Sequence, residues 1–360
     1  MSYPDISDNS YHIFKFHVNK LKNYKFIWIV SDVSLSRKKL KEMRNIDSFN
    51  KTKIVSKKSF FGIWYFLRSR HIFHTHGTYF FTSNTNKHKT INLWHGMPIK
   101  TIGWLDPENN YSPSISDIYI ATSKIYSYIM ASAFNANINS VWVTGLPRND
   151  VFTTKPLLNK IQLSLLDINE EDKLIVWLPT YRQSNQGHIR SDSTSSSFID
   201  ELSSNFLETI DKFLATKNIK IIIKLHPMDT LNDKEWSHYK NIKIINIKAW
   251  EEIGVDLYEL LSYSSGLISD ISSVIIDYII SGKPIGIFTN SNNNYSRGFV
   301  FDMDINLIPN STELESIDSA KQFINNINAH TACEIKKNIF YDIDNTNASY
   351  EISKRLGLIK

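Results

Sequence analysis

Short runs of apolar residues alternate with amphipathic segments along most of the chain. The first run covers residues 24–31, and a second series begins at residues 174–178. Runs of this length predict buried strands, whereas segments 35–44, 124–134 and 198–215 have the apolar spacing of helices. Strands that alternate with helices are typical of a parallel sheet with helices on both faces. We therefore predict an α/β protein.

Turn residues divide this alternation into two parts. A turn at residues 145–150 closes the first series, and residues 153–156 have the composition of a linker. The second series contains predicted strands at 219–225 and 242–247, and its last part, residues 312–356, is mostly helical in pattern. A chain of 360 residues is long enough for two domains of ordinary size.

An aromatic segment with basic flanks lies at residues 51–70. Five of the residues from 60 to 66 are aromatic, and the flanks contain Lys57, Lys58, Arg68 and Arg70. We predict a core helix whose cations reach solvent. The alternative is a helix that rests on an anionic membrane surface, where aromatic and basic side chains are favoured.

The charge balance and the cysteine content narrow the classes of function. A net charge of +5 and a pI of about 8.9 favour anionic partners such as nucleotides, phosphate polymers or a membrane surface. Nucleic acid is disfavoured, because the chain has neither zinc-finger spacing nor the aromatic signature of RNA-binding domains. The single cysteine, Cys333, excludes an internal disulfide and a cysteine-based zinc cluster, which fits a reducing cytoplasm. We see no signal peptide and no apolar run that could span a bilayer, so we expect a soluble or peripheral protein.

The stretch Trp94-His95-Gly96-Met97-Pro98 contains the main candidate for catalysis. The apolar run before it stops at Trp94, and Gly96 and Pro98 break the strand before a helix can begin. His95 is thus expected at the carboxyl end of a strand, where α/β proteins bind ligands. A histidine can take a proton from a hydroxyl near neutral pH, so His95 is a candidate general base. The alternative is a loop histidine that only forms hydrogen bonds.

Three other polar sites directly follow predicted strands. They are Pro179-Thr180, His226 and residues 270–273. In two facing α/β domains such positions converge on the cleft between the domains. Lys224, beside His226, offers a further donor to a phosphate, and Arg148 could form a bidentate fork with one.

Ser272 and Ser273 open a predicted helix, where free amide groups and the helix dipole favour an anion. The alternative is a plain N-cap formed by Asp270 or Ser272. Asp277 lies one turn after Ser273 on the same face, and it is expected either to hold a ribose or nucleotide hydroxyl or to be a polar surface residue. A metal site built from Asp270, Asp277 and histidines lacks any supporting ligand spacing, so no metal is expected.

Six short motifs occur in order between Trp94 and Pro284. They are Trp94-His95-Gly96-Met97-Pro98-Ile99-Lys100, Gly145-Leu146-Pro147-Arg148-Asn149-Asp150, Pro179-Thr180-Tyr181-Arg182, Leu225-His226-Pro227, Ser269-Asp270-Ile271-Ser272-Ser273 with Asp277, and Lys283-Pro284. Together they resemble the motifs of the CDP-glycerol glycerophosphotransferases, the primases and polymerases of teichoic acids and related phosphate-linked capsules. Three positions depart from the family pattern: Met97 replaces a threonine, Lys224 stands where arginine is common, and Ile271 replaces a tyrosine.

The resemblance implies a GT-B fold, with two Rossmann-like domains and a cleft between them. An acceptor-side domain would cover residues 1–152, a CDP-glycerol-binding domain 153–335, and a C-terminal helix within 336–360 would pack back on the first domain. The implied reaction transfers glycerol phosphate from CDP-glycerol to a hydroxyl of a glycan, lipid-linked or polyol-phosphate acceptor, and releases CMP at the cytoplasmic face of the membrane. No cofactor is implied beyond the donor substrate CDP-glycerol.

The resemblance also assigns roles to the motif residues, with His95 and His226 as the catalytic pair. The pocket of His95 would be shaped by Trp94, Gly96 and Pro98. The donor pyrophosphate would be held by Arg148, Lys224, His226, Ser272 and Ser273. The nucleotide side would be contacted by Pro179, Thr180 and Asp277, and Leu225 is also expected among the substrate-binding residues.

Two rival functions stay open at this point. A GT-B glycosyltransferase that uses a nucleotide sugar would share the fold and the phosphate site. A non-catalytic subunit that recognises a phosphate polymer would bind the polymer without releasing CMP.

Overall fold

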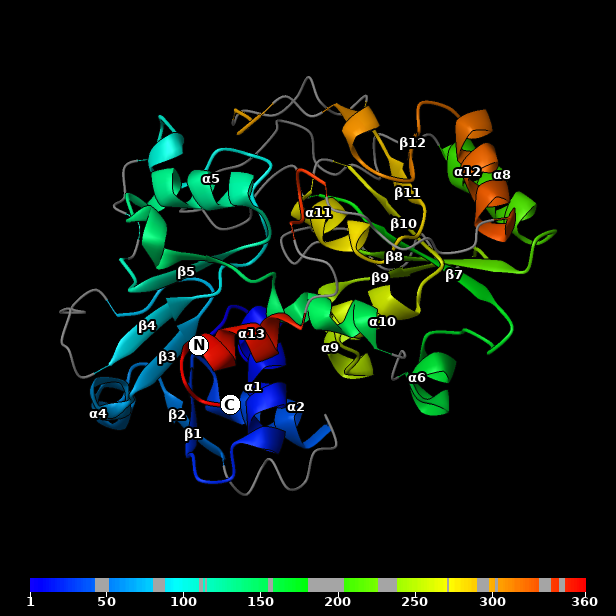
Figure 1. The fold of residues 1–360 in the computed structure, drawn as a ribbon. Helices are drawn as coiled ribbons and strands as arrows, with labels where there is room; N and C mark the ends of the chain where they lie inside the picture. Colours follow the sequence, from blue (N-terminus) through cyan, green and yellow to red (C-terminus); the bar gives the residue numbers. More distant parts are fainter. Residues whose placement is uncertain are drawn as a thin grey trace. The chain divides into compact units, whose positions relative to one another are not determined.

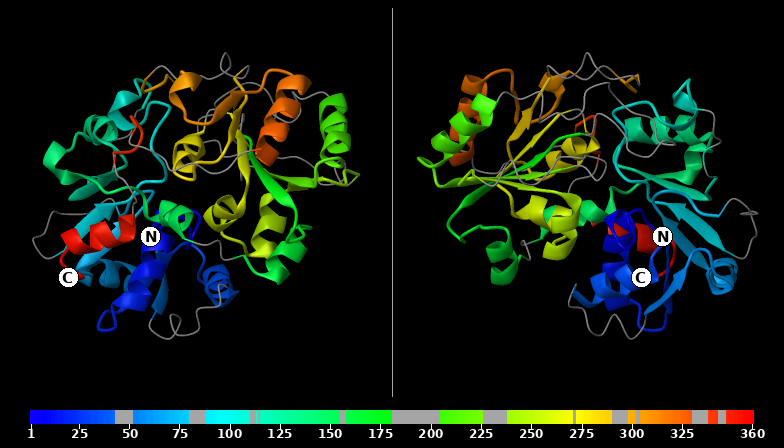
Figure 2. Two further views of the ribbon diagram at one scale, coloured as in Figure 1. Left: turned by 45° about the vertical axis from the view of Figure 1, so that its right-hand side comes forward. Right: turned by 180° about the vertical axis from the view of Figure 1, so that it is seen from behind.

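Two units, each built from parallel strands and helices, make up the chain (Figure 1). The first unit comprises Met1–Met97, Ile102–Thr154 and Lys336–Lys360, and the second comprises Pro98–Thr101 and Lys155–Ile335. Both ends of the chain lie in the first unit (Figure 2). The computed structural model describes residues 1–42, 52–79, 88–109, 113, 115–154, 158–180, 204–225, 238–270, 272–289, 298–301, 304–329, 338–342 and 347–360.

The first unit contains two parallel sheets. One is formed by β1 (Phe26–Val30) and β2 (Thr52–Ser56). The other has the order β3 (His71–His74), β4 (Lys89–Asn92), β5 (Ile118–Ala121) and β6 (Val141–Val143). The helices are α1 (Asp8–Lys20), α2 (Val33–Glu42), α4 (Phe60–Arg68), α5 (Lys124–Phe134) and α13 (Ala348–Arg355), with 3₁₀ turns η1 (Gly103–Leu105), η2 (Ile138–Ser140) and η3 (Pro147–Thr153).

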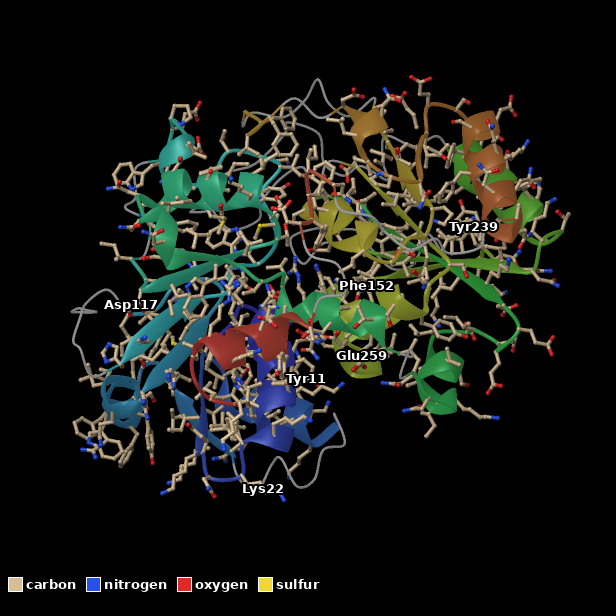
Figure 3. The ribbon with its side chains drawn as sticks, viewed as in Figure 1. Tyr11, Lys22, Asp117, Phe152, Tyr239 and Glu259 are labelled. Carbon is tan, nitrogen blue, oxygen red and sulfur yellow. The ribbon has the colours of Figure 1, made fainter. Side chains whose placement is uncertain are left out.

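Local interactions explain where these elements begin and pack. Tyr11 of α1 lies in a buried cluster with Trp28 of β1 (Figure 3). The carboxylate of Asp117, which is labelled in Figure 3, accepts the N–H and the hydroxyl of Thr90 at 2.7 and 2.8 Å and so aligns β4 with the start of β5. Helix α5 begins where the Ser123 hydroxyl accepts an amide of the first turn, so the predicted helix at 124–134 is confirmed.

Helix α13 is held against α1 and η3. The Asp150 carboxylate accepts the N–H groups of Ala348 and Ser349 at 2.6 and 3.0 Å, and His17 Nε2 of α1 lies 2.7 Å from Ser353 Oγ. Burial raises the pKa of Asp150 to about 6, although its hydrogen bonds from Ser349 and Ala348 act in the opposite direction. The end of the motif at residues 145–150 therefore anchors the C-terminal helix.

The second unit is built on one six-stranded parallel sheet. Its order is β12 (Ser311–Glu313), β11 (Ile285–Ile287), β10 (Gly266–Ser269), β7 (Lys173–Leu178), β8 (Ile219–Lys224) and β9 (Ile242–Ile245). The helices are α6 (Lys160–Leu165), α8 (Ser204–Leu214), α9 (Ile247–Ile253), α10 (Leu257–Tyr263), α11 (Ser273–Ile279) and α12 (Ile317–Ala329), with the 3₁₀ turn η6 (Ile305–Leu307).

Helices cover both faces of this sheet (Figures 1 and 2). On one face, Leu207 of α8 and Phe323 of α12 pack with Ile223 of β8 in a large buried cluster. Helices α9, α10 and α11 lie on the other side (Figure 1). The prediction of a parallel α/β protein is confirmed in both units, because strands rich in isoleucine and valine are buried between helices.

One prediction about secondary structure was wrong. Residues 51–70 do not form a single helix, because 52–56 pair with β1 as strand β2 and the helix begins at Phe60. Nor is α4 a core helix: Phe60 and Phe61 are 75% and 61% exposed. The prediction that residues 312–356 are mostly helical is confirmed, because α12 and α13 make up most of their described part; the short strand β12 at their start pairs with β11. Residues 198–203 of the predicted helix at 198–215 lie outside the described residues, and the described part forms α8.

No helix within the described ranges combines the length and the apolar character needed to cross a membrane.

Candidate active site

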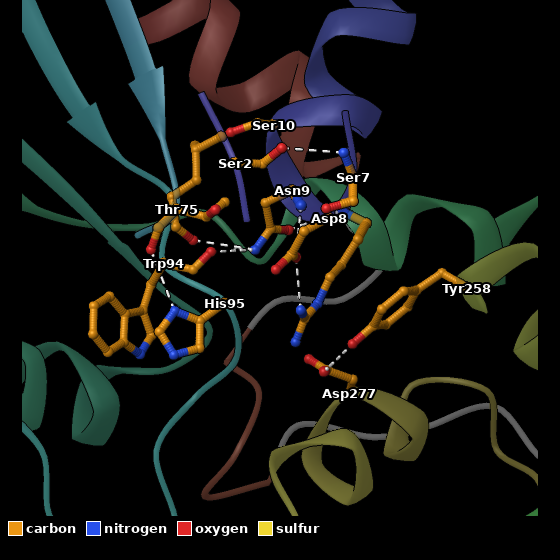
Figure 4. Close-up of polar contacts among 12 residues, drawn as sticks. Ser2, Ser7, Asp8, Asn9, Ser10, Thr75, Trp94, His95, Tyr258 and Asp277 are labelled. Carbon is orange, nitrogen blue, oxygen red and sulfur yellow. Dashed lines mark hydrogen bonds and ion pairs between the residues drawn. The ribbon is translucent and has the colours of Figure 1, made fainter. Parts of the chain in front are cut away.

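The loop after β4 places His95 where the sequence predicted it, just beyond the carboxyl end of a strand. Trp94 has a positive φ of 51°, a strained conformation for a large side chain. Two asparagines support it. Asn92 Oδ1 accepts the Trp94 N–H at 2.9 Å. Asn9, labelled in Figure 4, donates from Nδ2 to the carbonyls of Leu93 and Trp94 at 3.2 and 2.9 Å. The strained turn is therefore fixed by side chains from two elements.

The next residues of the loop continue this turn. Gly96 has a φ of 130°, which favours glycine over any residue with a side chain. Met97, which replaces the family's threonine, is wholly buried, and Pro98 begins the short segment assigned to the second unit. In that unit, Ile99 and Thr101 form backbone hydrogen bonds with Val300 and Gly298 at 2.9 and 2.8 Å.

The ring of His95 is held by a carbonyl and by stacking. Nδ1 lies 3.3 Å from the carbonyl oxygen of Thr75 (Figure 4), and the ring stacks on His76 with centroids 4.1 Å apart and planes 11° apart. Trp94 packs against the same ring at 4.1 Å. Because a carbonyl oxygen can only accept, the neutral ring carries its proton on Nδ1. Nε2 then has the free lone pair that a general base needs.

The charge state of His95 follows from its surroundings. Burial lowers the pKa of His95, and the nearby Arg148 lowers it further, whereas Asp8 and the carbonyl of Thr75 raise it. The net direction is downward, so the ring is neutral at pH 7. A proton on both stacked rings would place two positive charges face to face, which also favours a neutral His95.

Arg148 belongs to the same group of residues. Its guanidinium forms a 2.7 Å ion pair with Asp8, and its backbone N–H donates to Asn9 Oδ1 at 3.1 Å (Figure 4). Arg148 is only 4% exposed. The start of α1 therefore connects the turn that contains His95 with the turn that contains Arg148.

In the second unit, the predicted residues gather at one edge of the sheet. Strands β10, β7 and β8 are neighbours and run parallel, so the residues that follow them lie at the same carboxyl edge. Asp270, after β10, is fully buried and accepts the N–H of Thr180, after β7, at 2.8 Å. The Thr180 hydroxyl donates to the other carboxylate oxygen of Asp270. Pro179 and Thr180 are thereby fixed next to Asp270, just before the start of α11.

Helix α11 begins after an N-cap at Ser272, one of the two cap residues that the sequence suggested. The Ser272 hydroxyl accepts the Val274 N–H at 3.5 Å, so Ser272 rather than Asp270 is the N-cap. Asp277, in the middle of α11, is fully buried and accepts the Tyr258 hydroxyl at 2.7 Å (Figure 4). The interpretation of Asp277 as a polar surface residue is therefore wrong. That Ser273 and Asp277 contact a donor substrate stays a prediction.

Lys224 ends β8 at the same edge. Its ammonium group lies 5.4 Å from the centre of the Trp250 ring. Burial lowers the pKa of Lys224 to about 8, while Glu251 acts in the opposite direction, so the side chain is charged at pH 7. Leu225, the next residue, is 3% exposed and donates its N–H to Ile245 at 3.0 Å. His226 lies outside the described residues.

The lysine of the last motif also has a structural role. Lys283 donates to the carbonyls of Ser262, in the last turn of α10, and of Ser264, the C-cap of α10, at 2.7 and 2.6 Å. No cluster of three or more histidine, cysteine, aspartate or glutamate side chains arranged for a metal ion occurs among the described residues.

Sequence reasoning missed Asp8, Asn9 and His76 in the first unit and Tyr258 in the second. Asn9 and Trp94 are separated by 85 residues, and Asp8 and Arg148 by 140, so no local pattern connects them. His76 lies two residues beyond the end of β3, and the histidine-rich run at residues 71–76 was the one available signal.

Parallel sheets with helices on both faces, and polar side chains gathered at the carboxyl ends of neighbouring strands, are typical of α/β proteins that bind ligands at that edge. The chain belongs to the CDP-glycerol:poly(glycerophosphate) glycerophosphotransferase family, whose sequence profile matches residues 1–357. The predicted family is thus confirmed.

Individual relatives are similar over most of the chain. The teichoic acid poly(ribitol-phosphate) polymerase of Bacillus spizizenii is 23% identical over 83% of this chain and 46% of its own length. The teichoic acid poly(glycerol phosphate) polymerase of Staphylococcus epidermidis is 26% identical over 73% of this chain and 38% of its own. The teichoic acid glycerol-phosphate transferase of Staphylococcus aureus is 26% identical over 70% of this chain and 65% of its own length. The chain thus spans less than two thirds of each of these relatives.

Solved structures show the fold. The wall teichoic acid polymerase TagF aligns with a TM-score of 0.71 at 20% identity, over 99% of this chain and 87% of that chain. The predicted GT-B class is thereby confirmed. The UDP-GlcNAc 2-epimerase of Methanocaldococcus jannaschii, solved with UDP-GlcNAc and UDP, aligns with a TM-score of 0.53 at 13% identity. Because this general fold also occurs in an enzyme of nucleotide sugars, the fold alone does not select the donor.

Proposed function

We propose that the chain transfers glycerol phosphate from CDP-glycerol to a hydroxyl of an acceptor and releases CMP. Membership of the glycerophosphotransferase family supports the reaction class. The observation that carries the proposal is the orientation of His95, whose Nδ1 faces the Thr75 carbonyl so that Nε2 is the basic nitrogen. A neutral histidine held in this way is prepared to accept a proton from a hydroxyl.

In the proposed reaction, the acceptor oxygen attacks the β-phosphorus of CDP-glycerol while Nε2 of His95 takes its proton. The bond between the β-phosphorus and the oxygen bridging to the α-phosphate breaks, and the bridging oxygen leaves with CMP. The transition state carries negative charge on the phosphoryl oxygens, so hydrogen-bond donors and cations around it are the main source of rate acceleration.

The donor side of the proposal uses residues that the motifs select. The pyrophosphate would be bound by Arg148, Lys224, His226, Ser272 and Ser273. Lys224 is charged at pH 7 and ends a strand at the sheet edge where Thr180 also lies, which is consistent with an anionic ligand there. Pro179, Thr180, Leu225 and Asp277 would contact the nucleotide side.

We propose that these groups act without a metal ion or another cofactor. The named residues offer N–H donors, two of them cationic, and hydroxyl donors, which can balance the charge of a pyrophosphate directly. The corresponding test is CMP release in buffer with EDTA, which should proceed at the rate measured with added magnesium.

The acceptor and the place of the reaction form the finer part of the proposal. Several relatives are named as teichoic acid polymerases or glycerol-phosphate transferases. By analogy, we take the acceptor to be a glycan, a lipid-linked saccharide or a growing polyol phosphate. Such acceptors place the chain in peripheral contact with the inner face of the cell membrane.

The decisive experiment measures CMP released from CDP-glycerol with and without a lipid-linked acceptor. We compare the parent protein with His95→Ala and with His238→Ala, which removes an exposed histidine of the second unit. General-base assistance is typically worth about 10²- to 10⁴-fold, so His95→Ala should lower turnover by that factor and leave CDP-glycerol affinity largely intact. Parent-like turnover of His95→Ala would refute the assignment.

The same assay separates the rival functions. If CDP-glycerol is inert and a UDP-sugar releases UDP, the chain is a glycosyltransferase. If no donor is consumed but a phosphate polymer binds, the chain is a binding subunit. CDP-ribitol is included because one relative is a poly(ribitol-phosphate) polymerase.

A further inference from the structure

Helix α1 begins with an acidic residue, Asp8, whose carboxylate is held in one place. Its Oδ1 atom accepts hydrogen bonds from the Asn9 N–H at 2.6 Å and from the Arg148 guanidinium at 2.7 Å. Asn9 in turn donates to the carbonyl of Trp94, so the start of the helix lies beside the turn that contains His95 (Figure 4). Asp8 is therefore close both to the candidate base and to the cation of the next motif.

The ion pair between Asp8 and Arg148 is shielded from water. The two side chains are only 13% and 5% exposed. An exposed ion pair contributes little, but removing one partner of a shielded pair leaves the other charge poorly solvated and uncompensated. Asp8 thus cancels the charge of Arg148 at a place where water cannot do so.

Charged and titratable groups face His95 from three elements of the first unit. Burial lowers the pKa of His95 and Arg148 of η3 lowers it further, whereas Asp8 of α1 raises it. His76, which follows β3 and stacks on His95, is neutral at pH 7, because burial lowers its pKa well below the ordinary value. These three neighbours together carry no net charge, and without Asp8 they would carry one positive charge.

We propose that Asp8 is the counter-charge of His95: it pairs with Arg148 in the free protein and stabilises the imidazolium that forms when His95 takes the acceptor proton. The proton moves from the acceptor hydroxyl to Nε2 of His95, and none passes to Asp8. Asp8 touches no substrate in this role, so it is a positioning residue that acts through Arg148 and His95. The role rests on the proposed function in taking His95 as the base.

A purely structural role for Asp8 makes the opposite prediction. Asp8 has a φ of 60°, which asparagine adopts as readily as aspartate, and an asparagine oxygen would also accept the Asn9 N–H. A backbone role therefore leaves the shielded ion pair unexplained. Loss of a counter-charge would lower the pKa of His95, whereas a loosened turn would expose the ring to water and raise its pKa toward the ordinary value.

The test follows the titration of His95 by NMR in the full chain, with no donor or acceptor present, and His95→Ala assigns the signal. Asp8→Asn removes the charge and keeps the shape, and Asp8→Glu keeps the charge. The matched control is Glu108→Gln, which removes the charge of an exposed glutamate in the same unit. Arg148→Gln and Asp8→Asn/Arg148→Gln complete the cycle, and the double variant leaves no uncompensated cation if Asp8→Asn alone does not fold.

We expect His95 to titrate at a lower pH in Asp8→Asn than in the parent, while Asp8→Glu and Glu108→Gln stay close to the parent. The double variant should titrate below Arg148→Gln and above Asp8→Asn, because the two charges act in opposite directions. Turnover of Asp8→Asn at saturating CDP-glycerol should fall on the order of 10-fold, because a weaker base accepts the proton less readily. The acidic limb of its kcat/KM profile should shift to lower pH.

The counter-charge role is overturned if the titration of His95 in Asp8→Asn is unchanged or shifts to higher pH, or if turnover stays at the parent level despite a lowered midpoint. If Asp8→Asn does not fold, equal midpoints in Arg148→Gln and in the double variant overturn it. The titration contains no substrate, so failure of the proposed transferase activity is distinguishable. A lowered midpoint together with inert CDP-glycerol would refute the reaction and leave the electrostatic coupling of Asp8 to His95 in place.

Discussion

Asn9 offers a sharp test of how the turn at His95 is held. Its amide donates to the carbonyls of Leu93 and Trp94, and its oxygen accepts the Arg148 N–H. Asn9 is 0% exposed, so Asn9→Ala leaves a buried amide of Arg148 without this acceptor. The two bonds donated by the Asn9 amide are each worth roughly 0.5–1.5 kcal/mol, and the unsatisfied amide of Arg148 costs about 1–3 kcal/mol, so the free energy of unfolding should fall by roughly 2–6 kcal/mol.

Asn9→Ala should also slow catalysis, although Asn9 is expected to touch no substrate. Without the amide, the strained turn at Trp94 can relax and displace His95, and a displacement of about 1 Å can cost on the order of 10²-fold in turnover. Urea denaturation followed by circular dichroism measures stability, and CMP release measures turnover. Asn139→Ala, at an exposed asparagine of η2, is the control. If both quantities for Asn9→Ala match those of this control, the argument that Asn9 supports the turn is refuted.

Two further substitutions test the site and its supports. His76→Ala uncovers one face of His95, so the pKa of His95 should rise toward its ordinary value and the acidic limb of the pH–rate profile should shift to higher pH. His76→Phe keeps a stacked ring and should leave the acidic limb in place. An unchanged limb in His76→Ala would contradict this role. Asp150 has a pKa raised from 3.8 to about 6, so the folded state binds its proton more tightly than the unfolded state and this group contributes stability that is lost as the pH rises from about 4 to about 6. Asp150→Asn should remove a pH dependence on the order of 2–3 kcal/mol between pH 4 and pH 7, measured by urea denaturation; an identical pH dependence in the parent and the variant would show that burial does not perturb Asp150.

Elements with strong apolar periodicity could be predicted from the sequence. Strand β7 and helix α5 occur close to or at their predicted bounds, because their local patterns agree with their burial. The motif at Trp94 was also placed correctly, since Gly96 and Pro98 mark the end of a strand in any context. Local chemistry and tertiary structure point to the same answer at these positions.

Helix α4 and Asn9 show why other features could not be predicted. An amphipathic aromatic segment has the same spacing whether its apolar stripe faces the core or the solvent, and the choice is made by Gly62, which seats the opposite face on β2. The positive φ of Trp94 depends on hydrogen bonds from a helix that lies 85 residues away in sequence. Such contacts are properties of the folded chain and leave no local pattern.

These long-range contacts also show why the motifs alone do not fix the geometry around His95. The turn that contains His95 and the turn that contains Arg148 are each too short to fix a side chain by themselves. The start of α1 supports both, through Asn9 for the first and through Asn9 and Asp8 for the second. Because Trp94 stores strain in its backbone, the turn keeps its shape only while both asparagines, Asn9 and Asn92, are bonded to it. The residues before the first recognisable motif are therefore as necessary to the geometry of His95 as the motif itself.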